Sequence, residues 1–321
     1  MNPAGGSGDD VSEGISFTHL DEVLFDGSNA TKRDLVDYLD GVSERIIREL
    51  EGRPLSVIRV HRGHDAFMQK NMPKYAPAWI PTAKFWAGTS KREVSYALCN
   101  DRRTLLWFAN QRAIEYHPAL VRADRPDRMT HIVLDLDPPG GDHFKMAVRA
   151  ARSVHQALAE LGLEGAIKTS GAKGLHVFVP VADLASADAA AATRALAARA
   201  EALDPEVATT EFMKSQRDGK VFVDSTRAGT ATVVAAYSPR VRPGVPVSFP
   251  LAWDQLDDVA PSDFTVHSAL RRLGMTDPWA SQMPSPQALP ASLVEEGRAI
   301  PVARVQAMHE GKRRARARRA E

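Results

Sequence analysis

The sequence predicts a mixed α/β domain, and three observations indicate this class. Short apolar runs that stop at Gly, Pro or Asp are typical of buried strands. Two long stretches rich in Ala and Leu are typical of helices. Strand and helix patterns alternate over 321 residues, a length that suits one large domain or two small ones.

The first elements follow from local spacing. A helix is expected over 32–50, because apolar residues recur there at helical spacing after the cap candidate Thr31. The β-rich run 55–60 predicts a strand. Residues 71–92 are broken by three prolines and a glycine, and this predicts a long ordered loop.

The second half carries the clearest alternation of strands and helices. The run HIVLDLD is a buried-strand pattern that a Pro-Pro-Gly-Gly sequence stops at once. Pro-rich segments at 239–250 and 284–301 are expected to wrap the surface. Strands are expected at 131–137, 166–171, 175–181, 220–224 and 230–238, with helices at 144–161 and 185–203.

Composition excludes several classes of protein. The 44% hydrophobic and 25% charged contents are those of an ordinary globular protein. No apolar run approaches the roughly 18–20 residues that span a bilayer, and the start of the chain lacks the features of a secretory signal. The one cysteine, Cys99, cannot form an internal disulfide or a zinc cluster. The expected compartment is the cytoplasm, and the Gly-, Ser- and Asp-rich residues 1–14 are expected to be a disordered N-terminus.

Charge is unevenly distributed along the chain. The net charge is +1, but KRRARARR at 312–319 holds six of the cations and Glu321 follows, so the rest carries −4. A phosphate-binding surface must therefore be local. Residues 59–74 are the candidate, with four Lys or Arg and two His against one acid. The basic tail, 304–321, either adds affinity for DNA by counterion release or is a flexible solubilising end.

Two aspartates, Asp135 and Asp137, stand where the predicted strand 131–137 ends. Period-two geometry puts both side chains on one face of the sheet. Two such carboxylates repel each other unless a cation lies between them, and Mg²⁺ and Mn²⁺ prefer oxygen ligands. Asp224 ends another apolar strand and supplies a third carboxylate. Solvated aspartates in a turn, with Asp224 as a strand-end cap, remain the alternative.

The string TSGAKGLHV lies between two predicted strands and indicates anion binding. Its glycines let the backbone approach a ligand closely. Lys173 offers a point charge, while Ser170 and His176 can donate hydrogen bonds to phosphate. The spacing is not that of a Walker loop. A hairpin turn with a surface lysine is the alternative.

Further cations flank the strand that ends at Asp224. Lys214 and Arg217 precede it, and Arg240 follows the next predicted strand. From one side of the sheet they could reach a triphosphate, although surface arginines are commonly only solvated charges. His117, in IEYHP, could contact phosphate or metal, or could be structural.

Several strings taken in order resemble one family closely. HIVLDLDPPGG, TSGAKGLHVFVPV, KVFVDST and AAYSPRVRPGVPVSFPLAWDQL are similar to successive motifs of the polymerase domain of bacterial ligase D, in the archaeo-eukaryotic primase superfamily. The likeness runs from about Phe17 to beyond Trp253. It implies one catalytic domain, 15–303, with an archaeo-eukaryotic primase-like core, a mixed sheet flanked by helices and an RNA-recognition-like module.

The resemblance also implies roles for individual residues. Two Mn²⁺ or Mg²⁺ ions would be held by Asp135, Asp137 and Asp224. Phe67 falls where the family stacks an aromatic on the template base, and Met68 stands where a second aromatic is common. The incoming nucleotide would be held by His117, Ser170, Lys173, Lys214, Arg217 and Arg240, to which the anion-binding string adds His176. The DNA contacts that the family implies are Lys32 and Phe67, and the basic stretch 59–74 adds Arg59, Arg62 and Lys70 as candidates.

The sequence departs from the family at Glu22. A lysine is common at this position and, together with the residue matching Lys32, grips the 5′-phosphate on the far side of a gap or break. A glutamate would repel that phosphate, while Lys32 could still attract it. The resemblance therefore leaves recognition of the downstream 5′-phosphate open.

The expected function is template-dependent extension of a DNA primer from nucleoside triphosphates, with ribonucleotides preferred. Short-gap filling, end joining and priming all remain open. The implied partners are DNA, a separate DNA ligase and an end-binding protein, because the chain has no room for ligase or nuclease domains, and the implied location is the bacterial cytoplasm at the nucleoid. Two other functions stay open: a metal-dependent phosphohydrolase or nuclease, and a non-catalytic module that binds DNA gaps or ends.

Overall fold

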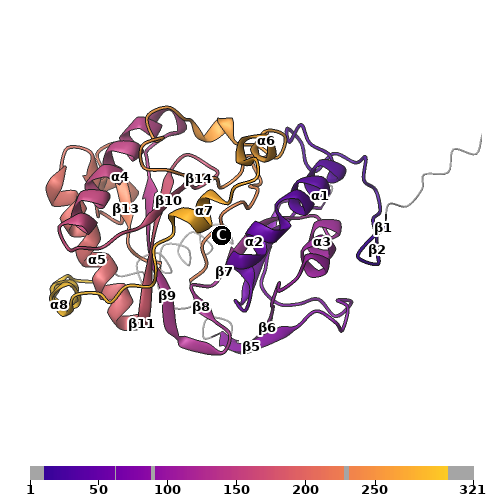
Figure 1. The fold of residues 1–321 in the computed structure, drawn as a ribbon, viewed down its shortest axis with the longest axis horizontal. Helices are drawn as coiled ribbons and strands as arrows, with labels where there is room; N and C mark the ends of the chain where they lie inside the picture. Colours follow the sequence, from indigo (N-terminus) through magenta and orange to yellow (C-terminus); the bar gives the residue numbers. More distant parts are fainter. Residues whose placement is uncertain (1–10, 62, 88–90, 228–230, 303–321) are drawn as a thin grey trace, which may run out of the picture.

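Two large β-sheets with their helices, and a small two-stranded sheet, make up the described part of the structure, a computed structural model (Figure 1). It describes residues 11–61, 63–87, 91–227 and 231–302. The larger sheet and its helices lie on the left in Figure 1, and the smaller sheet lies with three helices on the right. In the described residues no helix is long and apolar enough to cross a membrane.

The larger sheet has the strand order β12-β13-β9-β11-β10-β14, and β8 pairs with β9. Helices α4 (Phe144–Ala159) and α5 (Ser186–Leu203) pack against it, and α8 (Ala291–Ala299) packs on α5. The strands are β8 (Val121–Arg122), β9 (Arg125–Asp137), β10 (Ala166–Thr169), β11 (Leu175–Ala185), β12 (Ala208–Thr209), β13 (Val221–Asp224) and β14 (Pro250–Leu251). This sheet matters for function because β9, β11 and β13 carry the predicted acids and the predicted loop.

The smaller sheet has the order β4-β3-β6-β5, and β7 pairs with β3. Its strands are β3 (Leu55–Arg59), β4 (Phe67–Gln69), β5 (Thr82–Ala87), β6 (Arg92–Ala97) and β7 (Ala113–Pro118). The helices beside it are α1 (Lys32–Gly41), α2 (Ser43–Leu50) and α3 (Arg102–Asn110). The remaining elements are β1 (Val11–Ser12), β2 (Ile15–Ser16), η1 (Gly141–His143), η2 (Lys214–Gln216), η3 (Pro261–Asp263), α6 (Ala269–Leu273) and α7 (Pro278–Gln282).

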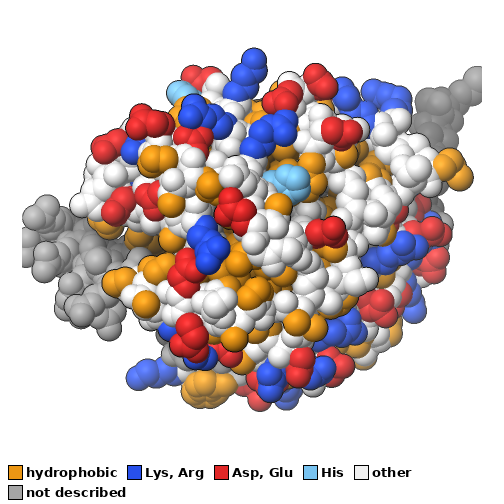
Figure 2. Space-filling view, turned by 60° about the vertical axis from the view of Figure 1, so that its left-hand side comes forward, with side chains coloured by type: hydrophobic (Ala, Val, Ile, Leu, Met, Phe, Trp, Pro, Cys, Tyr) orange, Lys and Arg blue, Asp and Glu red, His pale blue; other side chains and the backbone are white. Residues whose placement is uncertain are grey.

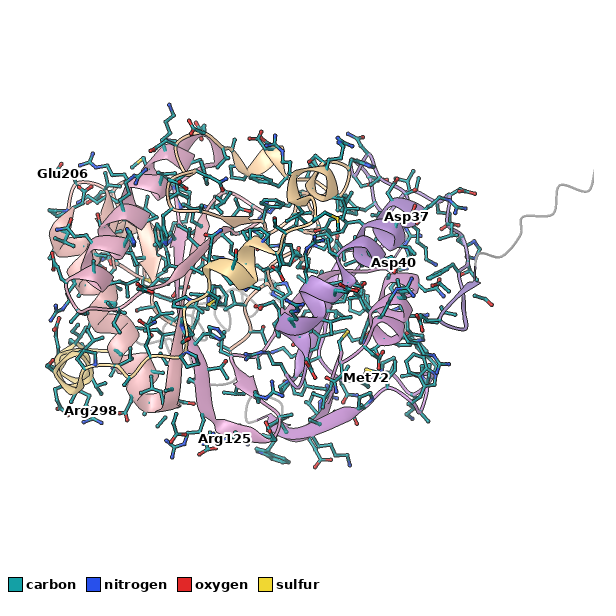
Figure 3. All side chains as sticks on the ribbon, in the orientation of Figure 1. Asp37, Asp40, Met72, Arg125, Glu206 and Arg298 are labelled. Carbon is teal, nitrogen blue, oxygen red and sulfur yellow. The ribbon has the colours of Figure 1, made fainter. Side chains whose placement is uncertain are left out.

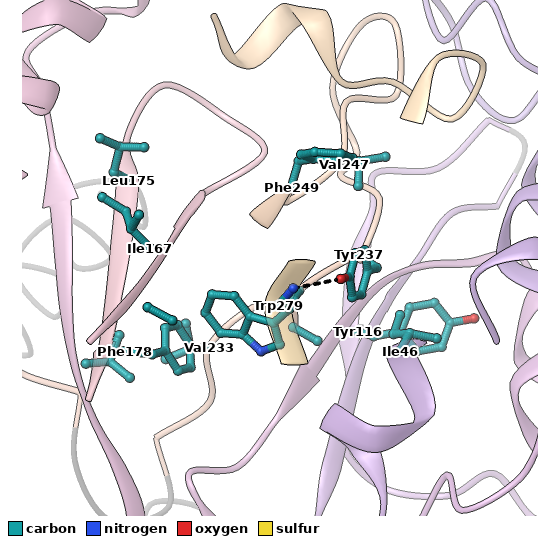
Figure 4. Close-up of a cluster of buried hydrophobic side chains, with 14 of the residues drawn as sticks. Ile46, Tyr116, Ile167, Leu175, Phe178, Val233, Tyr237, Val247, Phe249 and Trp279 are labelled. Atoms are coloured by element: carbon teal, nitrogen blue, oxygen red, sulfur yellow. Dashed lines mark hydrogen bonds between the residues drawn. The ribbon is translucent and has the colours of Figure 1, made fainter. Parts of the chain in front are cut away.

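A buried aromatic cluster joins the two halves (Figure 4). Trp279 lies at its centre with Tyr237 beside it: the Tyr237 hydroxyl donates to Asp277 at 2.6 Å and accepts from the backbone of Trp279 at 3.2 Å. The Tyr38 hydroxyl of α1 donates to the carbonyl of Tyr237 at 2.7 Å. The Trp279 ring meets Phe178 of β11 edge-on. The sheets are thus held together by apolar burial and satisfied hydroxyl groups.

The structure corrects the predicted helix at 32–50, which is two helices. α1 begins with the capping box of Thr31 and Asp34, as the cap candidate predicted. The chain leaves helical geometry at Val42, between α1 and α2. Gly41, just before this break, lies against Leu270, and a Cβ there would come within 2.9 Å of that side chain. Glycine at position 41 therefore allows the end of α1 to pack closely against Leu270.

Two further predictions about strands are wrong. Residues 71–92 are not a loop throughout, because Thr82–Ala87 pair with β6 along their whole length. The expected strand 230–238 does not form a strand in its described part, residues 231–238. These residues make single backbone hydrogen bonds to the carbonyls of Tyr116 and Pro118 and one isolated β-bridge. Pro118 has no N–H to donate, and the Ser238 hydroxyl, not a backbone carbonyl, accepts from the Tyr116 N–H at 2.9 Å.

The terminal and Pro-rich segments also differ from prediction. Residues 11–14, expected to be disordered, belong to a small hairpin of β1 and β2. The segment 239–250 is partly core, since Val245, Val247 and Phe249 are buried. The segment 284–301 contains α8. The other predicted disordered residues, 1–10, and the whole basic tail, 304–321, lie outside the described residues.

The visible face in Figure 2 carries Lys, Arg, Asp and Glu side chains interspersed rather than gathered by sign. Some of these charges pair between elements: Arg102 of α3 donates to Asp40 of α1, and Arg298 of α8 donates to Asp188 of α5. Asp40 and Arg298 can be followed in Figure 3. Exposed pairs of this kind add little to stability.

Candidate active site

The predicted acids lie in a row that crosses four neighbouring strands. Asp135 of β9 is the cross-strand partner of Asp224 of β13 on one side and of His176 of β11 on the other. His176 in turn faces Lys168 of β10. Cross-strand partners share one face of a sheet, so the row brings both strand-end acids together, as the sequence predicted. Asp137, two residues beyond Asp135, lies on the same face.

Cations surround each acid of this cluster. Lys173 Nζ lies 3.0 Å from Asp137 Oδ1, and Arg217 Nη1 lies 3.6 Å from its Oδ2. Arg227 Nη2 lies between the other two carboxylates, 3.1 Å from Asp135 Oδ2 and 3.4 Å from Asp224 Oδ2. The cluster of like charges is therefore compensated.

The side chains present fit a hard divalent cation. All donors of the three aspartates are oxygens, which Mg²⁺ and Mn²⁺ prefer. Arg227 occupies the position of positive charge between Asp135 and Asp224. In the described part of the chain no three His, Cys, Asp or Glu side chains already converge as a metal cage. An ion bound between these two acids would have to displace the Arg227 guanidinium.

The deep end of the row is buried and polar. His176 Nε2 lies 3.2 Å from Asp135 Oδ1, and Lys168 Nζ lies 2.9 Å from His176 Nδ1. Burial, and next the charge of Lys168, lower the pKa of His176 to about 4. Burial raises the pKa of Asp135, but His176 and Arg227 outweigh it and hold that pKa well below its usual range. His176 is therefore neutral and Asp135 ionised at neutral pH.

The opposite side of the site carries the groups predicted to face a triphosphate. Ser170 Oγ accepts from the backbone N–H groups of Ala172 and Gly174 at 3.2 Å, which shapes the loop. Arg240 donates to the Ser170 carbonyl. Glu115, which is buried, lies 2.8 Å from His117 Nε2 and 3.0 Å from Arg240 Nε. Glu115 thus holds together two of the predicted phosphate contacts.

A cavity of about 320 Å³ lies at this site. Its lining includes Asp135, Asp137, His117, Ser170, Lys173, His176 and Arg240. Arg227, Arg242 and Met68 also reach it. The structure therefore brings seven of the predicted catalytic and nucleotide-binding residues to one cavity, with Asp224 beside Asp135.

Gly174 allows the close contact between β11 and β9 that sets this geometry. A Cβ at Gly174 would lie 2.0 Å from the carbonyl oxygen of Leu136, which is backbone and cannot swing away. We expect Gly174→Ala to destabilise the protein by about 1–3 kcal/mol or more, the usual cost of overpacking. Urea unfolding measures it. Gly141→Ala is the matched control, because nothing lies within 4 Å of that Cβ, and equal stability of the two variants would contradict the prediction.

Other predicted residues lie elsewhere. Lys214 and Lys70 are exposed and line no part of the cavity. Lys32 and Arg59, which were expected to contact DNA, are buried. Lys32 Nζ donates to the Thr18 carbonyl and to Asn110, at 2.5 and 2.6 Å. Arg59 donates to Gln69, Tyr75 and Gln111. Arg62 lies outside the described residues.

The base-stacking candidate Phe67 is on the surface. Its side chain is 39% exposed, and its neighbour Met68 is 46% exposed. The His61 ring stacks on Phe67 with 5.4 Å between centroids and 14° between planes. These side chains form an apolar platform beside the cavity, which Met68 also lines.

Three residues of the site were missed from sequence. Lys168 stands in the apolar run AIKT, Arg227 stands three residues after Asp224, and Glu115 stands two residues before His117. The last spacing puts both side chains on one face of a strand and could have indicated Glu115. Nothing local distinguishes Arg227 from a solvated arginine.

Comparisons with known proteins agree with this geometry. A family model described as the LigD primase-polymerase domain matches residues 31–279. The bifunctional non-homologous end joining protein LigD of Bacillus subtilis is 32% identical over 267 residues, 81% of this chain and 42% of that protein. The multifunctional non-homologous end joining DNA repair protein LigD of Mycobacterium tuberculosis H37Rv is 34% identical over 273 residues, 81% of this chain and 35% of that protein. The chain thus spans less than half the length of these relatives.

A solved structure shares the fold. The polymerase domain from Mycobacterium tuberculosis ligase D in complex with DNA is similar with a TM-score of 0.76 and 31% identity, covering 84% of this chain and 99% of that chain. This likeness confirms the predicted fold class, an α/β domain with an archaeo-eukaryotic primase-like core.

Proposed function

Since the chain belongs to the family of LigD primase-polymerase domains, we propose that it is a metal-dependent nucleotidyltransferase that extends a primer on a DNA template. The observation that carries the proposal is one cavity lined both by carboxylates and by predicted phosphate-binding groups. Asp135 and Asp137, with Asp224 adjacent, meet His117, Ser170 and Arg240 there. Carboxylates together with phosphate-binding groups suit metal-assisted phosphoryl transfer.

The protein's own groups divide the work in this reaction. Arg240, His117 and the Ser170–Gly174 loop would hold the triphosphate and stabilise charge on its oxygens. Asp135, Asp137 and Asp224 would hold two Mn²⁺ or Mg²⁺ ions. Such ions, when bound, lower the pKa of the primer 3′-hydroxyl and neutralise the leaving pyrophosphate. We propose ribonucleotides as the preferred substrates and Mn²⁺ as the preferred metal, as the family resemblance implies.

Phe67 is proposed to stack on the template base that pairs with the incoming nucleotide. We expect Phe67→Ala to weaken binding of a gapped primer-template by about 1–3 kcal/mol, the value of stacking one base on an aromatic ring. Fluorescence anisotropy with labelled DNA measures it. A DNA that lacks this template base is the control: it should bind the wild type and the variant equally. An equal loss on both DNAs would contradict base stacking.

Recognition of a downstream 5′-phosphate is proposed to be weak. Glu22 pairs with Arg112 at 2.9 Å, and Lys32 is buried against Thr18 and Asn110. The neighbouring cavity of about 810 Å³ is lined by Glu22, Asp26 and Asp65 with His61 and His64. Its acids repel phosphate at neutral pH. We therefore propose that the protein fills short gaps or extends broken ends whether or not a 5′-phosphate follows.

A primer-extension experiment tests the proposal. The protein is mixed with a labelled primer on gapped DNA, with or without the 5′-phosphate, Mn²⁺, and each ribo- or deoxyribonucleoside triphosphate in turn. We expect templated addition, faster with ribonucleotides, and rates that differ little between the two gaps. Release of inorganic phosphate without extension would mean a phosphohydrolase instead.

One observation favours a second function, a DNA gap- or end-binding module without catalysis. The Arg227 guanidinium already neutralises Asp135 and Asp224, as a metal-free protein would require. Tight binding of gapped DNA with no extension under any nucleotide or metal would support this module. Metal-dependent extension would exclude it and would mean that Arg227 moves when the ions bind.

A further inference from the structure

Lys168 is the buried end of the cross-strand row that leads through His176 to Asp135 and Asp224. Its side chain is fully buried. In the described part of the chain Nζ makes hydrogen bonds to His176 Nδ1 at 2.9 Å and to Ser248 Oγ at 2.6 Å, and it lies 5.3 Å from the ring centroid of Phe178. It does not line the cavity, so a substrate in the cavity would not touch it.

Burying a lysine side chain lowers the stability of the protein, so a buried lysine indicates that its amino group has a role. Lysine is among the residues least often fully buried, and removing its amino group from water is unfavourable. A methionine would fill similar space without that cost. The two polar partners of Lys168 therefore indicate a task beyond packing, and one of them is the ring that contacts Asp135.

The hydrogen bonds on both sides of His176 specify its tautomer. A neutral imidazole has one N–H donor and one acceptor nitrogen. Lys168 can donate to Nδ1, which leaves the proton on Nε2, and Nε2 lies 3.2 Å from a carboxylate that can only accept. The opposite tautomer would put a lone pair against Asp135 Oδ1. Lys168 and Asp135 thus favour the same form.

We propose that Lys168 is a positioning residue that fixes His176 as the Nε2–H tautomer and thereby commits Asp135 Oδ1 to His176. Asp135 Oδ2 then faces the position that the Arg227 guanidinium occupies, with Arg227 Nη2 3.1 Å from Oδ2. The inference that Asp135 Oδ2 would bind a metal ion for nucleotidyl transfer rests on the proposed function. The tautomer does not, because it follows from the contacts of the protein alone.

The first test uses the unaltered protein. With ¹⁵N-labelled histidine, long-range proton–nitrogen NMR at neutral pH distinguishes the two tautomers, and His176→Gln assigns the signal among the ten histidines. We expect His176 to carry its proton on Nε2. A proton on Nδ1 would overturn the proposal, and this result needs no variant of Lys168 to fold.

The second test is Lys168→Met, with exposed Lys145→Met as the matched control. We expect the variant to show mixed His176 tautomers. It should also bind Mn²⁺ about 10–100-fold more weakly, the usual effect of losing a residue that orients a metal ligand through hydrogen bonds. Electron paramagnetic resonance measures the Mn²⁺ affinity. The double variant with His176→Gln should lose no more Mn²⁺ affinity than His176→Gln alone, because Lys168 acts through that ring.

The outcomes separate this proposal from the proposed function. An unchanged tautomer and unchanged Mn²⁺ affinity in Lys168→Met would mean that Lys168 only fills space, even if the protein is a polymerase. A protein without primer extension but with the expected tautomer change would refute the polymerase and retain the role of Lys168.

Discussion

A protein carrying Asp135→Asn should extend a primer on gapped DNA at least about a hundredfold more slowly than the wild type, the range for losing one preorganised electrostatic group. Asparagine keeps the size of the side chain and removes its charge. Asp135 is the centre of the row, 3.2 Å from His176 and 3.1 Å from Arg227, and it faces Asp224 across the strands. The loss should therefore fall on the binding of cations as well as on the rate.

Quenched-flow primer extension and Mn²⁺ titration together measure this effect. Asp142→Asn is the matched control, because Asp142 lies just past the same strand, is 83% exposed and pairs with its neighbour His143. It should behave as the wild type. Extension by Asp135→Asn within about tenfold of the wild type would show that Asp135 is not a metal ligand, since a metal site supplies several kcal/mol.

The acids could be predicted from sequence only in part. Asp135 and Asp137 share a strand, so period-two geometry fixes their common face locally. That Asp224 lies opposite Asp135 depends on the pairing of β13 with β9, which are far apart in sequence. Nothing in KVFVD specifies this partner strand. Only the order of several motifs, matched to a family, linked the three aspartates.

The burial of two predicted DNA contacts could not be predicted for a different reason. Arg59 was selected by its charge and Lys32 by its place in a family motif, but neither feature determines exposure. Their burial depends on Asn110 and Gln111, two neighbouring residues at the end of α3 that accept from them. Lys168 was missed for a related reason. In the sequence, a lysine within an apolar strand cannot be distinguished from a surface lysine, and only the folded structure shows its partner His176. Long side chains reach partners that local spacing does not reveal.

The second large effect is expected from Glu115→Gln, which should lower the free energy of unfolding by about 3–5 kcal/mol at neutral pH, the cost of breaking a buried ion pair. Glu115 is 5% exposed and Arg240 is 17% exposed, with 3.0 Å between them. The carboxylate also accepts from the backbone N–H of Val241 at 2.8 Å and contacts His117. Glutamine keeps the shape but leaves the Arg240 charge without its partner.

The loss should depend on pH in a defined direction. Burial alone would raise the pKa of Glu115, but His117, Arg240 and the Val241 N–H outweigh it and lower that pKa from 4.5 to about 2. A pKa that is lower in the folded state stabilises above pH 4.5, by about 3 kcal/mol here, and this stability is lost as the pH falls toward 2. Urea unfolding should therefore show the wild type and Glu115→Gln converging as the pH falls from about 4.5 toward 2, while the exposed-site control Glu206→Gln stays parallel to the wild type. A gap that stays constant with pH would mean that the ionised carboxylate of Glu115 is not the source of the difference in stability. In that case His117 and Arg240 would not owe their orientation toward the cavity to its carboxylate, and nucleotide affinity should survive the substitution.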